Sequence, residues 1–190
     1  QCKDKAFAKW KEHDIPIPDF FSFKNKDEFY KGLEISNISL PFLIRINNGV
    51  SGFDSFKITE TKELNYKLNQ ILDLLENNNS IDPCCLCVEL IDTIDRKHDV
   101  NHSFRIHVSG DRVSSGYGRV SNPDDWVAIS GKFGDKISDA WIEYNVKCEN
   151  LMNDYEDLIV KAVNVLDCAS GIGYGSYILS KSKKEKKEDA

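Results

Sequence analysis

The residues best suited to chemistry lie in the segment PFLIRINNGVSGFDSFKI, residues 41–58. An apolar strand carries one cation, Arg45, near its end and runs into a loop that contains Gly49, Ser51 and Gly52. Small residues let a backbone approach a ligand closely, and its N–H groups can then point at oxygen atoms. With a cation alongside, this pattern indicates phosphate binding, and the alternative is an ordinary hairpin.

The elements that must position this segment predict a mixed α+β fold. Apolar residues at helical spacing predict helices over residues 3–12, 26–34, 61–76 and about 148–166. The prolines of IPIPDFFSF, residues 15–23, predict an extended entry into a strand, and strands are predicted over residues 40–46, 53–59, 84–91, 103–108, 112–120 and 171–179. The run CCLCVELI at 84–91 is continuously apolar, which is typical of a strand buried on both faces. A long loop is expected from about residue 121 to 146.

Composition limits the class of protein. The chain has 190 residues, 41% of them hydrophobic and 29% charged, which is typical of a globular protein. A formal net charge of −6 argues against nucleic acid as the main partner. No apolar run approaches the length of about 20 residues that a membrane span needs, so a soluble protein is expected. The six cysteines do not suit a small disulfide scaffold, so we expect free thiols in the cytoplasm.

Four segments, taken in order, resemble the ATP-grasp superfamily over Cys2 to about Leu179. They are CKDKAFAKWKEHDIPIP, the segment 41–58, CVELID and SFRIHVSGDRVSSGYGRV. The resemblance implies an α+β, two-lobed ATP-grasp-like fold with mixed or antiparallel sheets and packed helices. It assigns residues 15–91 to the small lobe with its glycine flap and hinge. It assigns residues 1–14 and 92–180 to the C-terminal lobe, and the charge-dense composition of residues 181–190 predicts a disordered tail.

The resemblance also implies roles for individual residues in binding ATP. Lys3 falls at the lysine that reaches the ATP phosphates, with Lys5 as the alternative if the register slips. Arg45 takes the place of a lysine in the second segment, and the loop with Gly49, Ser51 and Gly52 would close over the nucleotide.

The later segments imply contacts to the base and to the phosphates. The backbone of Glu89 and Ile91 would present an acceptor and a donor to the adenine edge. Arg105 and Arg119 fall in register with two family arginines, of which Arg119 is expected to act in catalysis by facing the phosphates.

Each of these cations also has a simpler interpretation. Arg45 could be a surface charge on a strand, and Lys3 could belong to a solvated helix face. Arg119 could form a cross-strand ion pair, and Arg105 could face solvent, because it alternates with apolar residues.

By resemblance, the chain is part of an ATP-dependent ligase that uses Mg²⁺ and joins carbon to nitrogen. A small carboxylate would be activated as an acyl phosphate and then attacked by an amine or a thiol. The acceptor is not identified by the sequence, and a homo-oligomer is left open.

Magnesium ligands are missing where the resemblance places them. The predicted strand at 171–179 has no suitable carboxylate, and no Glu-x-Asn pair follows it. Either the chain stops before the metal-binding strand, or it is a degenerate module that binds nucleotide without turning it over.

Two clusters of potential metal ligands are given a structural interpretation instead. Cys84, Cys85 and Cys87 have no second cysteine pair or histidine cluster nearby, so they are expected to be buried as small apolar residues. His98, His102 and His107 lie within ten residues, but only His107 is predicted to lie within a strand, so no metal site is assigned.

Overall fold

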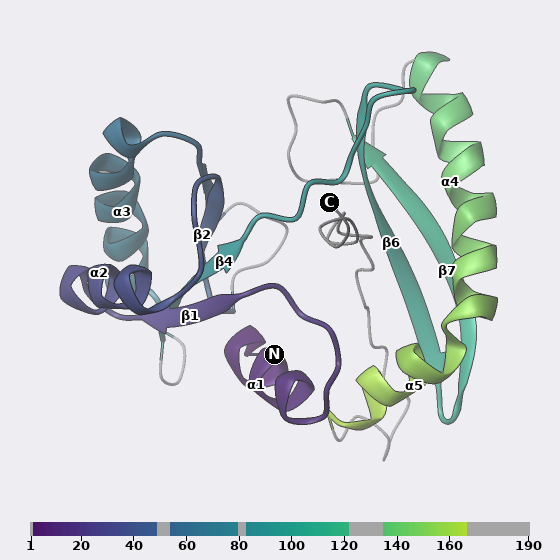
Figure 1. Ribbon diagram of the computed structural model, residues 1–190, viewed down its shortest axis with the longest axis horizontal. Coiled ribbons are helices and arrows are strands. Elements are labelled where there is room, and N and C mark those ends of the chain that lie inside the picture. Colours follow the sequence, from purple (N-terminus) through teal and green to yellow (C-terminus); the bar gives the residue numbers. More distant parts are fainter. Residues whose placement is uncertain (1, 49–53, 80–82, 122–134, 167–190) are drawn as a thin grey trace, which may run out of the picture. The chain divides into compact units, whose positions relative to one another are not determined.

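The computed structural model describes residues 2–48, 54–79, 83–121 and 135–166 (Figure 1). The chain divides into two compact units, with the boundary between Leu90 and Ile91. The first unit contains α1 (Lys3–Glu12), β1 (Phe20–Phe23), α2 (Lys26–Ile35), β2 (Phe42–Ile46), β3 (Ser55–Ile58), α3 (Thr61–Glu76) and β4 (Cys85–Glu89). The second contains β5 (Ile94–Asp95), β6 (Val100–Ser109), β7 (Arg112–Ser121), α4 (Asp135–Asp154) and α5 (Glu156–Asn164).

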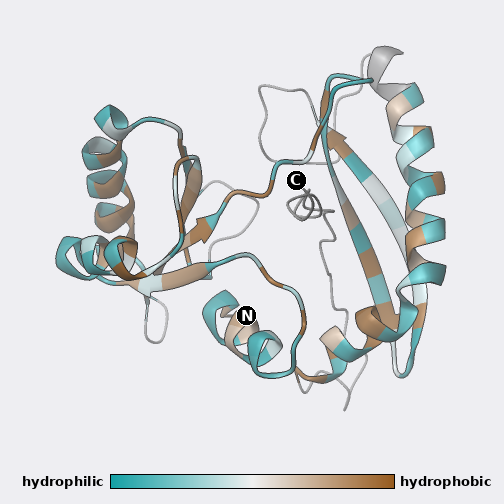
Figure 2. Cartoon of the chain, in the orientation of Figure 1, coloured by the Kyte–Doolittle hydropathy of each residue, from teal (hydrophilic) through white to brown (hydrophobic). Residues whose placement is uncertain are grey.

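The first unit is built on an antiparallel sheet with the strand order β1-β4-β2-β3. Its hydrophobic core joins one face of the sheet to α2 and α3, which turn their hydrophobic residues toward the strands (Figure 2). In β2 the core side chains are Phe42, Ile44 and Ile46, so strand alternation directs Arg45 to the opposite face.

Helix α1 packs on that opposite face. The ring of Phe7 lies 5.1 Å from that of Phe20, whereas Phe21 and Phe23 face the core with α2 and α3. Leu86 of β4, the register partner of Arg45, is fully buried beside the core residues Cys85 and Cys87. The prediction that this strand is buried on both faces is therefore confirmed.

The second unit is an antiparallel sheet, β5-β6-β7, with α4 lying along the two long strands (Figure 1). The helix approaches β7 closely because two glycines face it. A Cβ on Gly118 would lie 2.6 Å from the carbonyl carbon of Tyr144, and one on Gly116 would lie 2.7 Å from the sulfur of Met152. Phe104, Ile106 and Val120 complete the core under α4.

Most predicted elements are confirmed, and the errors lie in the second unit. Helix α4 begins at Asp135, so the expected loop to residue 146 was wrong. The helix predicted over 148–166 is interrupted at Tyr155, between α4 and α5. The buried stripe of α4 includes Ala140, Tyr144 and Cys148, and it was obscured in the sequence by hydrophobic residues that are exposed: Trp141, Ile142 and Val146.

Two further differences concern the β5–β6 region. The short strand β5 was not predicted, and β6 begins at Val100 rather than Ser103, which places His102 in a strand. The unit boundary falls one residue before the predicted lobe boundary, and α1 groups with the first unit. The assignment of residues 1–14 to the larger ATP-grasp lobe stays a prediction.

Some predictions lie outside the described residues, namely the strand at 171–179 and the tail at 181–190. None of the described helices is both long and apolar enough to cross a membrane.

Candidate functional site

Arg45 is the centre of the candidate site in the first unit. Its Nε atom is buried and has no hydrogen-bond partner. Burial lowers the pKa of the guanidinium, and the charge of Asp54 opposes this shift. An unsatisfied donor in a buried position is costly, so Arg45 Nε is free to donate to an acceptor that approaches it.

Lys3 lies beside Arg45, at the first position of α1. Its ammonium donates to the backbone carbonyl of Asn47 at 2.9 Å. The pKa of Lys3 falls from an ordinary 10.5 to about 8, first because of burial and then because of the positive charge of Arg45; Cys2 and Asp54 act in the opposite direction. A negatively charged ligand would offset the electrostatic repulsion between Lys3 and Arg45 and would favour the charged form of Lys3.

Asn47 fixes the start of α1 against the end of β2. The Asp4 N–H donates to Asn47 Oδ1 at 3.0 Å, and Asn47 Nδ2 donates to Asp4 Oδ1 at 2.7 Å. Asn47 is itself buried. Sequence reasoning missed this positioning residue, and its only signal was a polar residue directly after an apolar strand.

The small residues of the predicted flap, Gly49, Ser51 and Gly52, lie outside the described residues. The strands on either side form an antiparallel pair that ends with the Ile46 N–H donating to the Asp54 carbonyl at 2.9 Å.

Glu89 lies at the end of β4, where the adenine contact was predicted. Its N–H donates to the Asp19 carbonyl at 2.8 Å. The Asp19 N–H, in return, donates to the Glu89 carboxylate at 3.1 Å rather than to the Glu89 carbonyl. Ile91 follows two positions later as the first residue of the second unit.

Arg105 and Arg119 share the face of the β6–β7 pair that points away from α4. In register, Arg119 pairs with Ser103, and Arg105 pairs with Tyr117. The Arg119 Nε is buried and has no hydrogen-bond partner. Burial lowers the pKa of Arg119, the charge of Arg105 lowers it further, and Tyr117 opposes both.

Tyr117 is a second residue that sequence reasoning missed. The Arg105 guanidinium donates to its hydroxyl at 3.4 Å, and the ring of His107 stacks on its ring with centroids 6.0 Å apart. Among the described residues, no carboxylate forms an ion pair with Arg45, Arg105 or Arg119. The structure thus brings the predicted cations together in two pairs, Lys3 with Arg45 and Arg105 with Arg119.

The three cysteines before and within β4 are buried, as predicted. Burial raises the pKa of Cys85 and of Cys87 to about 12, and the neighbouring Cys84 adds to the shift at Cys85. Because the thiolate is the form that binds metals, these protonated thiols suit a core and not a metal site.

The known proteins most informative here are solved structures. No family model matches the chain, and no curated protein matches it in sequence. The fold is similar to that of an L-amino acid ligase from Bacillus licheniformis, with a TM-score of 0.54 and 14% identity over 90% of this chain and 37% of that one.

Two other ligases give similar values. The VanG D-Ala:D-Ser ligase from Enterococcus faecalis has a TM-score of 0.51 and 14% identity, over 86% of this chain and 44% of that one. The ATP-grasp ligase PsnB, solved with a minimal precursor, Mg and ADP, has a TM-score of 0.51 and 14% identity, over 97% of this chain and 46% of that one. This chain spans less than half the length of each of the three. At this identity the similarity concerns the fold, and it confirms the one that was predicted.

Proposed function

From the premise that the chain has an ATP-grasp fold, we propose that it binds ATP as part of a ligase that activates a small carboxylate. The observation that carries the proposal is the buried Nε of Arg45, which has no partner and lies beside the partly desolvated ammonium of Lys3. ATP carries about four negative charges, so its phosphates would supply both the acceptor and the charge that this pair lacks.

The two cations of this pair have different chemical capacities. An arginine presents a planar fork that binds phosphate oxygens in a bidentate manner, whereas a lysine acts as a point charge. Arg45 would therefore orient a phosphate, and Lys3 would neutralise it. Asn47 holds Lys3 in position through its contacts with the first turn of α1.

Arg119 is proposed to act on the phosphoryl group that is transferred. Its unpartnered Nε and the neighbouring charge of Arg105 favour an anionic ligand on this face of the β6–β7 pair. Positive charge that is fixed where negative charge develops stabilises a transition state without reorganisation. Glu89 would accept a hydrogen bond from the adenine edge through its backbone carbonyl, and Ile91 would donate one through its backbone N–H.

Bound ATP, with Mg²⁺, would supply the phosphoryl group that converts the carboxylate into an acyl phosphate for attack by an amine or a thiol. The segment in which magnesium ligands were sought, residues 171–190, lies outside the described residues. We therefore assign no residue of the chain to Mg²⁺.

The proposal is tested by titrating the protein with a non-hydrolysable ATP analogue and Mg²⁺ in a calorimeter. Arg45→Ala should weaken binding at least tenfold, because charge-assisted hydrogen bonds to phosphate are lost, whereas Arg45→Lys should retain part of the affinity. Arg112→Ala is the matched control, because Arg112 is exposed at the start of β7. Equal affinities of Arg45→Ala and wild type would contradict the site.

A second measurement separates the ligase from a module that only binds. Formation of ADP from ATP in the presence of candidate carboxylates would support the ligase. Tight binding of the analogue without ADP formation by the full-length protein would favour the degenerate module.

A further inference from the structure

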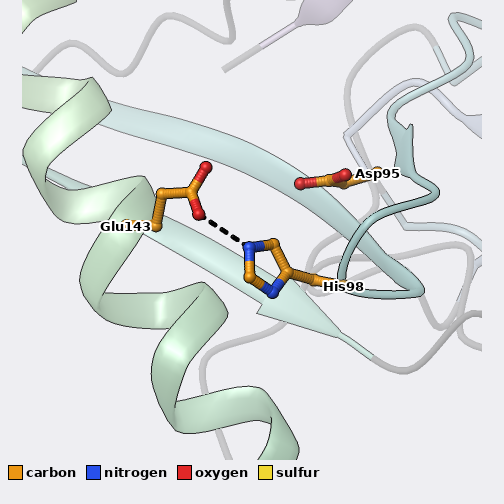
Figure 3. A group of neighbouring side chains, drawn as sticks. All are labelled: Asp95, His98 and Glu143. Carbon is orange, nitrogen blue, oxygen red and sulfur yellow. Dashed lines mark hydrogen bonds and ion pairs between the residues drawn. The ribbon is translucent and has the colours of Figure 1, made fainter.

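A separate group of ionisable side chains lies within the second unit, where β5 and the turn after it meet α4. Glu143 projects from α4 toward His98, and Asp95 lies beside them (Figure 3). One ligand atom from each of the three residues lies within 4.8 Å of the other two, and His98 Nε2 is 2.7 Å from Glu143 Oε2. This group differs from the histidine cluster considered from the sequence, because His98 is joined here by two carboxylates.

The spacing of these atoms suits a metal ion after small side-chain rotations. Bonds of about 2.0–2.1 Å to nitrogen and oxygen at tetrahedral angles place ligand atoms roughly 3.3 Å apart. His98 Nε2 and Glu143 Oε2 lie closer than this, at 2.7 Å, and all three ligand atoms lie within 4.8 Å of one another, so small rotations can reach this spacing. All three side chains are half-buried, so a bound ion would keep a path to solvent.

The Asp95 carboxylate is already oriented by two hydrogen bonds. The Tyr144 hydroxyl donates to Oδ2 at 2.8 Å, and the Lys97 N–H donates to Oδ1 at 2.8 Å. A carboxylate has about four acceptor positions, so two remain for a metal. Tyr144 is itself buried under β7 and stacked on His102 with ring centroids 4.3 Å apart. Hydrogen-bonded carboxylates of this kind are the usual outer support of metal ligands.

The Glu143 carboxylate forms ion pairs with two lysines, which a metal ion would have to displace in part. Lys97 and Lys147 each donate to it at 2.7 Å, but their side chains are 69% and 44% exposed. Exposed ion pairs of lysine contribute little, so a dication can displace at least Lys97, which shares Oε2 with His98. The same charges, together with His98, hold the pKa of Glu143 well below its ordinary range, so the carboxylate is ionised at neutral pH.

We propose that Asp95, His98 and Glu143 form a binding site for a divalent transition-metal ion such as Zn²⁺. One imidazole with two carboxylates suits such ions better than Mg²⁺, which prefers oxygen ligands alone. Three protein ligands leave a coordination position for water. This site is independent of the proposed nucleotide site, because it uses none of the same residues.

The test is a titration of the full chain with Zn²⁺ alone, in competition with a chromophoric chelator. Wild type should bind one ion at this site, and His98→Gln and Glu143→Gln should each weaken that binding at least tenfold. His107→Gln is the matched control, because His107 lies on the face of β6 that points away from α4, and it should leave the affinity unchanged. Lys97→Met should tighten binding, because it removes a competitor for Glu143 Oε2.

The competing explanations are distinguished in the same experiment. Co²⁺ in place of Zn²⁺ should give a d–d spectrum without thiolate charge-transfer absorption, which excludes binding through cysteine. Thermal unfolding of each variant verifies that it is folded. Unchanged Zn²⁺ affinity in His98→Gln, a thiolate band with Co²⁺, or no binding by wild type and Lys97→Met would overturn the proposal and leave an ion-pair network.

Discussion

Arg45 and Arg119 both have a buried Nε without a partner, but they lie in sheets that are built differently. The sheet that holds Arg45 packs against α2 and α3 on one face and α1 on the other. Arg119 lies on the face of the β6–β7 pair that points away from α4. Arg45 is accordingly more deeply buried than Arg119, and its nearest charges are Lys3 and Asp54.

Because of this difference, Arg45 and Arg119 are not expected to contribute equally to anion binding. A charge interaction strengthens as the surroundings become less polar, so Arg45 should bind an anion more strongly than Arg119. The two cations are also positioned by different means. Asn47 fixes Lys3 beside Arg45 by hydrogen bonds, whereas Arg119 directly follows Gly118, which packs closely against α4.

The largest expected effect is on nucleotide affinity. Arg45→Ala should cost about 1.5–3 kcal/mol of binding free energy, or roughly 10- to 100-fold, because hydrogen bonds to a charged group are lost from a buried position. Arg119→Ala should cost about 1 kcal/mol. Calorimetric titration of both variants would measure the ratio, and a larger loss for Arg119→Ala would reverse the comparison.

The next effect is on stability, and it tests how each cation is positioned. Asn47→Ala should lower the free energy of unfolding by about 1–3 kcal/mol, because it leaves partly buried polar groups of Asp4 in α1 unsatisfied. Nucleotide affinity should fall with it. Urea denaturation followed by circular dichroism provides the measurement, with Asn69→Ala on the exposed side of α3 as a control. A stability equal to wild type would show that α1 is held by other contacts.

Gly118→Ala makes the matching test in the second unit. A Cβ there would meet the backbone of Tyr144 at 2.6–2.7 Å, so α4 must shift, at a cost of about 1–3 kcal/mol. Gly116→Ala should cost less, because its nearest atom belongs to the flexible side chain of Met152. If the two variants were equally stable, the close approach of helix and strand would not determine the position of Arg119.

A smaller effect concerns pH. The pKa of Lys3 is lowered to about 8 from an ordinary 10.5, so the folded protein is penalised for the charged form below pH 8. That penalty disappears as pH rises from about 8 to 10.5, which favours folding, but the loss of charge weakens anion binding. Affinity for the nucleotide should therefore decline above pH 8 in wild type. In Lys3→Arg, whose charge persists, the decline should be absent, and parallel pH profiles would contradict the role of Lys3.

The sequence was sufficient to predict the parts of the molecule in which local pattern and packing agree. The continuous apolar run at 84–91 marked a strand buried on both faces, and the apolar stripe of α3 marked the limits of that helix. Prediction failed where burial depends on distant residues. Asn47 is buried where it bonds to Asp4 of α1, 43 residues away in the chain, and the start of α4 was hidden because Trp141 and Ile142 are exposed.

The residues of the candidate site were likewise predicted only in part. Resemblance singled out Lys3 and Arg45, which the fold brings together, and Arg105 and Arg119, which share one strand face. Tyr117 was missed because its role depends on cross-strand register, which a single strand does not encode. Glu143 was missed because its position was predicted to lie in a loop and not in a helix. The hydrogen bond between His98 and Glu143 was therefore not expected.

The most direct test of the account is a crystal structure of the full chain with a non-hydrolysable ATP analogue and Mg²⁺. We predict a phosphate oxygen within hydrogen-bond distance of Arg45 Nε, about 2.7–3.2 Å, and a second contact from the Lys3 ammonium. The adenine edge should meet the carbonyl of Glu89. A nucleotide bound elsewhere, with Arg45 Nε still unpartnered, would contradict the central claim.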